Sequence, residues 1–103
     1  MIRKSVITLK KMVKSQGELG QWIDKPQTRE VKCDVFSITQ AEMTMAAAYG
    51  YTPTWMVKTE VANYKGEEEA VFEGKPYAIY RSQIYGNNIS LYLQPETGAN
   101  DGE

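Results

Sequence analysis

Alternating apolar and polar positions dominate the chain and predict short β-strands. The clearest case is residues 29–36, where Val31, Cys33 and Val35 fall on one face and charged residues fall on the other. This period of two is typical of a strand that is buried on one side. Similar stretches, bounded by turns rich in Gly, Asn and Lys, predict further strands over residues 5–13, 54–62, 68–73, 77–84 and 89–93. The stretch 15–28, with its glycines and Pro26, is predicted to be a long loop.

The period changes after the second predicted strand. Residues 39–42 fit a capping box, in which the Thr39 hydroxyl accepts from the Glu42 amide and the Glu42 side chain reaches back to the Thr39 amide. Three consecutive alanines follow, and Gly50 then supplies a cap at the carboxyl end. We predict one helix over residues 39–49. A helix of this length is unstable alone in water, so it needs packing partners from its own domain or from neighbouring subunits.

Six strands and one inserted helix predict a mainly β fold. We expect a small six-stranded, mostly antiparallel β-barrel with the helix between strands 2 and 3. The length of 103 residues fits a single domain. Residues 1–94 are assigned to this barrel domain, and the polar, acidic residues 95–103 are expected to form a disordered tail.

The charge of the chain is balanced in total and uneven along its length. The net charge of −1 excludes the basic excess of a dedicated nucleic-acid binder. Residues 1–32 hold eight basic and three acidic residues, or +5, whereas residues 33–103 hold four basic and ten acidic residues, or −6. The two parts are either ordinary solvated surface or the means of head-to-tail contact between copies.

The composition removes most catalytic chemistry. The chain has no histidine and one cysteine, which excludes imidazole-based sites, an internal disulfide and a paired-cysteine zinc site. We therefore predict no catalytic, metal or cofactor site, and we expect Cys33 to be a small core residue. The three glutamates at 67–69 point to alternating faces and are interpreted as a solvated turn edge. No apolar run is long enough for a membrane-spanning helix, so no membrane partner is expected.

Several large or charged side chains are candidates for interaction surfaces. Trp22 and Ile23 form an apolar pair within the predicted loop, which either folds back onto the core, our preferred interpretation, or contacts a partner. Arg81 is expected to pair across strands with Glu60 or Glu68. The candidate subunit or partner interface consists of Trp22, Ile23, Tyr64, Arg81 and Tyr85.

The order of features over residues 31–93 resembles the siphophage head–tail joining family, whose members are also called head-closure or stopper proteins. The resemblance is carried by FSITQAE at 36–42, the helix exit with Gly50 and Pro53, NYKGE at 63–67, FEGKPY at 72–77, Tyr80 with Arg81, and LYL at 91–93. It implies a structural virion component and not an enzyme, assembled in the cytoplasm of a bacterial host.

The resemblance also implies partners. Members of the family form a ring, of twelve or six copies, between the portal and adaptor ring above and the tail terminator or tail-completion protein below, and they retain packaged double-stranded DNA in the channel. The segment between the second and third strands closes that channel. It maps here to residues 37–54, and the candidate channel-closing residues are Ser37, Ile38, Thr39, Gln40, Glu42, Met43, Met45, Tyr49, Gly50, Tyr51 and Pro53.

Two alternatives remain open at the level of sequence. One is a tail-completion protein, which the sequence separates poorly from a head-closure protein. The other is an oligonucleotide-binding barrel that stacks single-stranded bases on some of the seven tyrosines. That fold usually has its helix between the third and fourth strands, whereas the helix predicted here follows the second.

Overall fold

The computed structural model describes residues 2–96 and is a closed six-stranded β-barrel. Its elements are β1 (Ile2–Gln16), β2 (Trp22–Ser37), α1 (Gln40–Ala48), β3 (Trp55–Glu60), a short 3₁₀ turn (Val61–Asn63), β4 (Glu69–Phe72), β5 (Lys75–Tyr85) and β6 (Asn88–Pro95). The strands follow the order β1-β2-β3-β6-β5-β4 around the barrel, and neighbouring strands run antiparallel. The predicted fold class is therefore confirmed, including the helix between strands 2 and 3. Most of the predicted tail lies outside the described residues.

The core is built from the inward positions of all six strands. Val31, Cys33 and Val35 are buried together, as the alternation predicted. The other buried apolar side chains of the core cluster are Ile7, Leu9, Val57, Ala70, Phe72, Tyr77, Ile89, Leu91 and Leu93. Burial, with a smaller contribution from the Asp34 carboxylate, raises the pKa of the Cys33 thiol to about 11. Cys33 is thus a neutral core residue.

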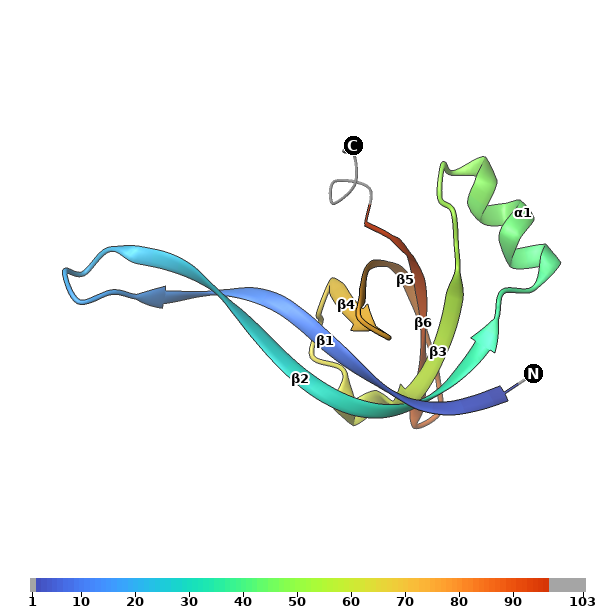
Figure 1. The fold of residues 1–103 in the computed structure, drawn as a ribbon, viewed down its shortest axis with the longest axis horizontal. Coiled ribbons are helices and arrows are strands. Elements are labelled where there is room, and N and C mark those ends of the chain that lie inside the picture. The colour runs from blue at the N-terminus through green and yellow to red at the C-terminus, as the bar shows by residue number, and fades with distance from the viewer. Residues whose placement is uncertain (1, 97–103) are drawn as a thin grey trace.

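The predicted loop 15–28 is wrong, because most of it belongs to a long two-stranded hairpin. β1 and β2 pair without a slip from Ile2 with Phe36 to Gln16 with Trp22. β1 contacts β4 only as far as Lys10, so beyond that point the hairpin leaves the barrel (Figure 1). We call residues 11–28 the ribbon. Its outer part has no core to face, so its sequence carries no apolar alternation and resembles a loop.

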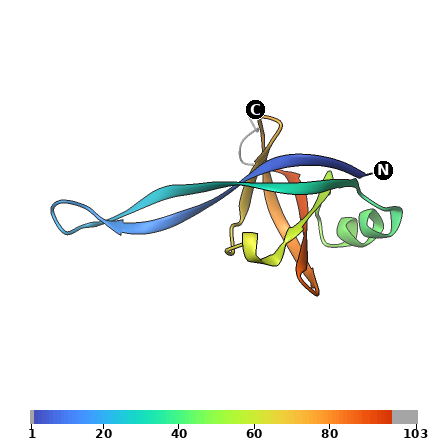
Figure 2. The same cartoon turned by 90° about the horizontal axis from the view of Figure 1, so that it is seen from below.

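α1 and the ribbon occupy opposite ends of an elongated molecule. The principal extents are 51, 36 and 23 Å, and the two views at right angles show the ribbon projecting at one end and α1 at the other (Figures 1 and 2). α1 begins as predicted, since the Thr39 hydroxyl accepts from the Glu42 amide at 3.2 Å. It ends one residue earlier than predicted, and Gly50 follows with a φ of +85°.

Candidate functional site

The segment between β2 and β3, residues 37–54, lies mostly outside the barrel. We call it the closing segment. Its return to the barrel is fixed by two hydrogen bonds, from the Thr54 amide to the Leu93 carbonyl at 2.8 Å and from the Thr52 amide to the Gln94 side chain at 2.9 Å. Within α1 only Glu42 and Ala46 are buried. The barrel therefore closes its own core without using most of this segment.

A buried carboxylate holds α1 against the barrel. Glu42 is 8% exposed, and it accepts hydrogen bonds from the Tyr80 hydroxyl at 2.7 Å and from the Arg81 guanidinium. Arg81 was expected to pair with Glu60 or Glu68, and that prediction is wrong. Both oxygens of the Glu42 carboxylate accept from β5, so a tertiary contact takes the place of the second half of the predicted capping box. Tyr80 and Arg81 lie on β5, so one side chain of α1 ties the helix to the wall of the barrel.

Aromatic rings extend this anchor. Tyr51 stacks on Tyr80 with ring centroids 4.6 Å apart, and the Arg81 guanidinium lies over the Tyr92 ring at 4.1 Å. Burial, followed by the Glu42 hydrogen bond, raises the pKa of the Tyr80 hydroxyl, and the same carboxylate raises the pKa of Arg81. Both groups therefore remain protonated donors throughout the neutral range. We call Glu42, Tyr51, Tyr80, Arg81 and Tyr92 the helix anchor.

A pocket of about 320 Å³ opens beside the helix anchor, between α1 and the barrel. Ile38, Met45 and Met56 form much of its apolar lining. Its charged lining residues, Glu42 and Arg81, are paired with each other, so the pocket offers no net charge to a ligand. The rest of the lining consists of Ser37, Thr39, Ala41, Gln83 and Tyr92. We call this the helix pocket.

The structure places the other predicted closing residues on the surface of this segment. Met43, Met45, Tyr49 and Tyr51 are large apolar side chains that remain exposed. Gln40 is also exposed, and its side chain contacts Thr44 at 3.4 Å. Gly50 and Pro53 lie on the chain that leads from α1 back to β3. The helix anchor holds this segment to the barrel, and the closing role of its residues stays a prediction.

The five predicted interface residues are not brought together. Trp22 lies at the tip of the ribbon, where it is 67% exposed, and Ile23 beside it is partly exposed, so the expectation that this pair folds back onto the core is wrong. Tyr85 is exposed at the β5–β6 turn. Tyr64 is half-buried and donates its hydroxyl to the Glu67 carbonyl at 2.6 Å. Tyr64 and Arg81 are thus mainly structural, whereas Trp22 and Tyr85 are free to meet a partner.

A second buried ion pair, which the sequence did not reveal, lies at the base of the ribbon. Glu67 is 2% exposed and accepts from Arg29 Nε at 3.1 Å, from Arg29 Nη2 at 2.8 Å and from the Lys65 amide at 2.7 Å. Arg29 also donates to the Asn63 carbonyl. Glu67 is therefore not the solvated turn residue that was predicted. Burial tends to raise its pKa, but the Lys65 amide and Arg29 together outweigh burial and hold the pKa of Glu67 below its usual range.

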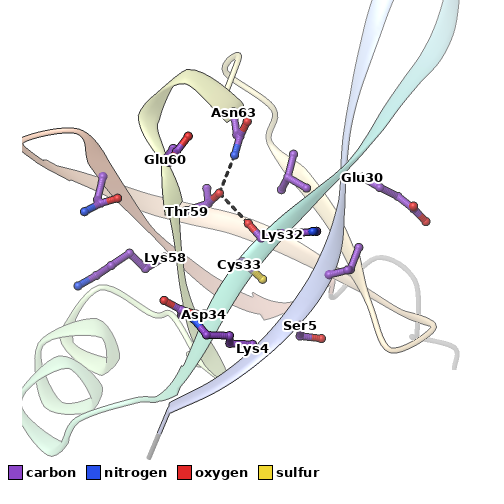
Figure 3. Close-up of a pocket in the computed structure, with 13 residues that line it drawn as sticks. Lys4, Ser5, Glu30, Lys32, Cys33, Asp34, Lys58, Thr59, Glu60 and Asn63 are labelled. Carbon is purple, nitrogen blue, oxygen red and sulfur yellow. Dashed lines mark hydrogen bonds and ion pairs between the residues drawn. The ribbon is translucent and has the colours of Figure 1, made fainter.

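A hollow of about 790 Å³ lies where β2 and β3 diverge (Figure 3). β2 pairs with β3 only from Asp34 to Ser37, and the Thr59 hydroxyl bridges the gap by donating to the Lys32 carbonyl at 2.8 Å. Three lysines and three carboxylates line the hollow, namely Lys4, Lys32, Lys58, Glu30, Asp34 and Glu60. Their charges balance, so this hollow selects neither an anion nor a cation.

Within residues 2–96 no cluster of acidic or cysteine side chains has the arrangement of a metal site. No helix in this part of the chain is long and apolar enough to cross a bilayer. Comparison with protein-family models and with curated proteins finds no match.

Proposed function

We propose that the protein is a structural component of a phage head–tail connector, a head-closure protein that forms a ring below the portal and adaptor. The observation that carries the proposal is the closing segment: a helical insertion between β2 and β3 that stands outside a complete barrel and keeps methionines and tyrosines exposed. A barrel that needed the insertion only for stability would bury more of it than Glu42 and Ala46.

In this proposal the closing segments of the ring meet across the channel and retain packaged double-stranded DNA. The small, exposed side chains of Ala47 and Ala48 allow close approach between helices, and Met43 adapts its shape to different neighbours. A ring repeats each weak contact once per subunit, so modest contacts add up to a stable closure. The family resemblance gives twelve or six copies, in a virion assembled in the bacterial cytoplasm.

Opening follows from the way α1 is attached. The helix is joined to β5 through the Glu42 carboxylate, and the connection from α1 to β3 contains Gly50 and Pro53. Release of the helix anchor would let the closing segment turn away from the channel while the barrel stays folded. A Val at position 50 is expected to impair closure or opening more than folding, because position 50 has a positive φ.

The test is electron microscopy of the protein mixed with its portal–adaptor complex. The expected result is one added ring of density on the tail side, with density from the closing segments in the channel. Absence of an added ring would overturn the proposal. A ring that binds the tail end instead would identify a tail-completion protein, and a salt-sensitive gel shift with single-stranded DNA would identify an oligonucleotide-binding barrel.

A further inference from the structure

The tip of the ribbon displays apolar side chains that no part of its own barrel covers. Leu19 is 90% exposed and Trp22 67% exposed, and Met12 is exposed further along β1. A two-stranded hairpin without a core is only marginally stable in water by itself. Trp is also the side chain type most enriched at the energetic centres of protein interfaces. The ribbon tip therefore has the features of a docking element.

The base of the ribbon holds this tip in a fixed direction. Arg29 joins β2 to the buried Glu67 carboxylate, and Lys11 on β1 donates to the Lys65 carbonyl at 3.0 Å. Lys10 pairs with Glu69 on β4 at 3.6 Å. Three contacts on two strands limit the motion of the ribbon where it leaves the barrel. A tip that is oriented in advance loses less conformational entropy on binding.

The helix pocket, at the opposite end of the molecule, has the chemistry of a receptor for such a tip. Its volume of about 320 Å³ is large enough for one bulky side chain, and Met45 and Met56 offer thioethers that contact aromatic rings favourably. Arg81 lines the same pocket, and a guanidinium stacks well on an indole ring. The neutrality of the pocket favours an uncharged aromatic side chain over the lysines of the ribbon.

We propose that the ribbon tip of one copy docks into the helix pocket of the next copy, with Trp22 as the inserted side chain. This inference rests on the proposed ring and names its subunit interface. The ribbon tip and α1 lie at opposite ends of the molecule (Figures 1 and 2), and the helix pocket opens beside α1, so the contact joins unlike surfaces and each copy uses both. Contacts of this heterologous kind generate closed rings when the rotation between copies closes.

The area at the tip explains why such a ring needs many copies. A large aromatic side chain buries roughly 150–250 Å², so Trp22 with Leu19 and Ile23 covers on the order of 500 Å². A stable two-protein complex usually buries about 800 Å² on each partner. One docked tip is therefore a weak contact, and ring closure or a template ring is required to make the assembly last.

Docking at the helix pocket leaves the other flank of α1 available to the channel. Successive helical residues are about 100° apart, so Met43 and Met45 lie roughly 200° from each other around the helix. Met45 lines the helix pocket, and Met43 does not. In each copy, the ribbon tip of the neighbouring copy would thus lie between α1 and the barrel, and the Met43 flank of α1 would be turned to the centre of the ring.

The experiment is site-directed crosslinking of the full chain at high concentration, without portal or adaptor. One variant carries Gln21→Cys beside the ribbon tip, and the other carries Ala41→Cys at the rim of the helix pocket. The matched control is Ala47→Cys, which replaces the same residue type on the same helix, is exposed, and lies outside the pocket. Cys33 is 6% exposed, so it stays outside the reach of a short bismaleimide.

The expected result is a covalent heterodimer from the Gln21→Cys and Ala41→Cys chains, at least fivefold more abundant than with Ala47→Cys. Adding Trp22→Ala to the first chain should remove this excess, whereas Tyr85→Ala, at a similarly exposed aromatic residue, should leave it. The docking would be overturned if no heterodimer formed, or if its yield were equal with Ala41→Cys and Ala47→Cys. It would also be overturned if Trp22→Ala left the yield unchanged. Specific crosslinking without an added ring on the portal–adaptor complex would support the docking and reject the connector function. An added ring without specific crosslinking would support the connector function and reject the docking.

Discussion

Replacing Glu42 by Gln tests whether the helix anchor alone holds α1 to the barrel. Gln keeps an acceptor for the Tyr80 hydroxyl but removes the charge that pairs with Arg81. Breaking a fully buried ion pair costs about 3–5 kcal/mol. The Arg81 side chain is 33% exposed and is partly solvated without its partner, so we expect about 2 kcal/mol here. Since 1.4 kcal/mol is a factor of ten, the equilibrium for detachment of α1 should rise about 30-fold.

Native-state hydrogen exchange measures this equilibrium directly. The Tyr51 amide donates to the Ala46 carbonyl at 2.9 Å, so it reports on the end of α1. We expect the protection of this amide and of the α1 amides to fall about 30-fold, which corresponds to the 2 kcal/mol above. Amides of Leu91 and Leu93 in β6 should keep theirs. Thr44→Ala is the control, because it removes only an exposed contact on the same helix. Equal loss of protection in β6 would show that α1 is integral to the barrel, and unchanged protection in α1 would show that the ion pair does not hold it.

Three further predictions concern other buried or constrained groups. The folded-state pKa of Glu67 is lowered, so its stabilising contribution is present above about pH 4.3 and is lost as the pH falls through the folded value; Glu67→Gln should lower the urea midpoint strongly at pH 7 and much less at pH 3. Gly50→Val should cost about 1–2 kcal/mol from its positive φ alone, because the position is open to solvent, and hydrogen exchange should locate the loss in α1. Cys33, with a pKa of about 11, should react with a thiol reagent at pH 8 only after unfolding, and rapid labelling of the native protein would contradict this.

The parts of the fold that face the core were predictable, because burial imposes a pattern on the sequence. Val31, Cys33 and Val35 alternate with charged residues since one side of β2 lies in the barrel. α1 was predictable from its capping residue, because the Thr39 hydroxyl accepts a hydrogen bond from the Glu42 amide, only three residues later in the sequence. The outer ribbon was missed because both of its faces meet water, so its two strands carry no periodic signal.

The ion pairs were missed for a different reason. Glu42 and Arg81 are 39 residues apart in sequence, and Arg29 and Glu67 are 38 apart. These residues come together only when the barrel closes. Glu67 is followed by two further glutamates, and the sequence alone does not distinguish a buried glutamate in such a run from a solvated one. The charge asymmetry of the sequence is partly preserved in space, because four lysines of the N-terminal part (Lys10, Lys11, Lys14 and Lys25) lie on the ribbon or at its base.

The seam between β1 and β4 governs the order in which this barrel forms. Among the described residues three pairs close it, Thr8 with Val71, Leu9 with Ala70 and Lys10 with Glu69. These partners are about 60 residues apart in sequence, whereas a short turn joins β1 to β2. Local hairpins form within microseconds and distant pairings later, so the ribbon forms early and this seam late. During synthesis on the ribosome, β1 is therefore made long before β4. Until β4 is made, the edge of β1 that pairs with β4, including the apolar Leu9, stays unpaired.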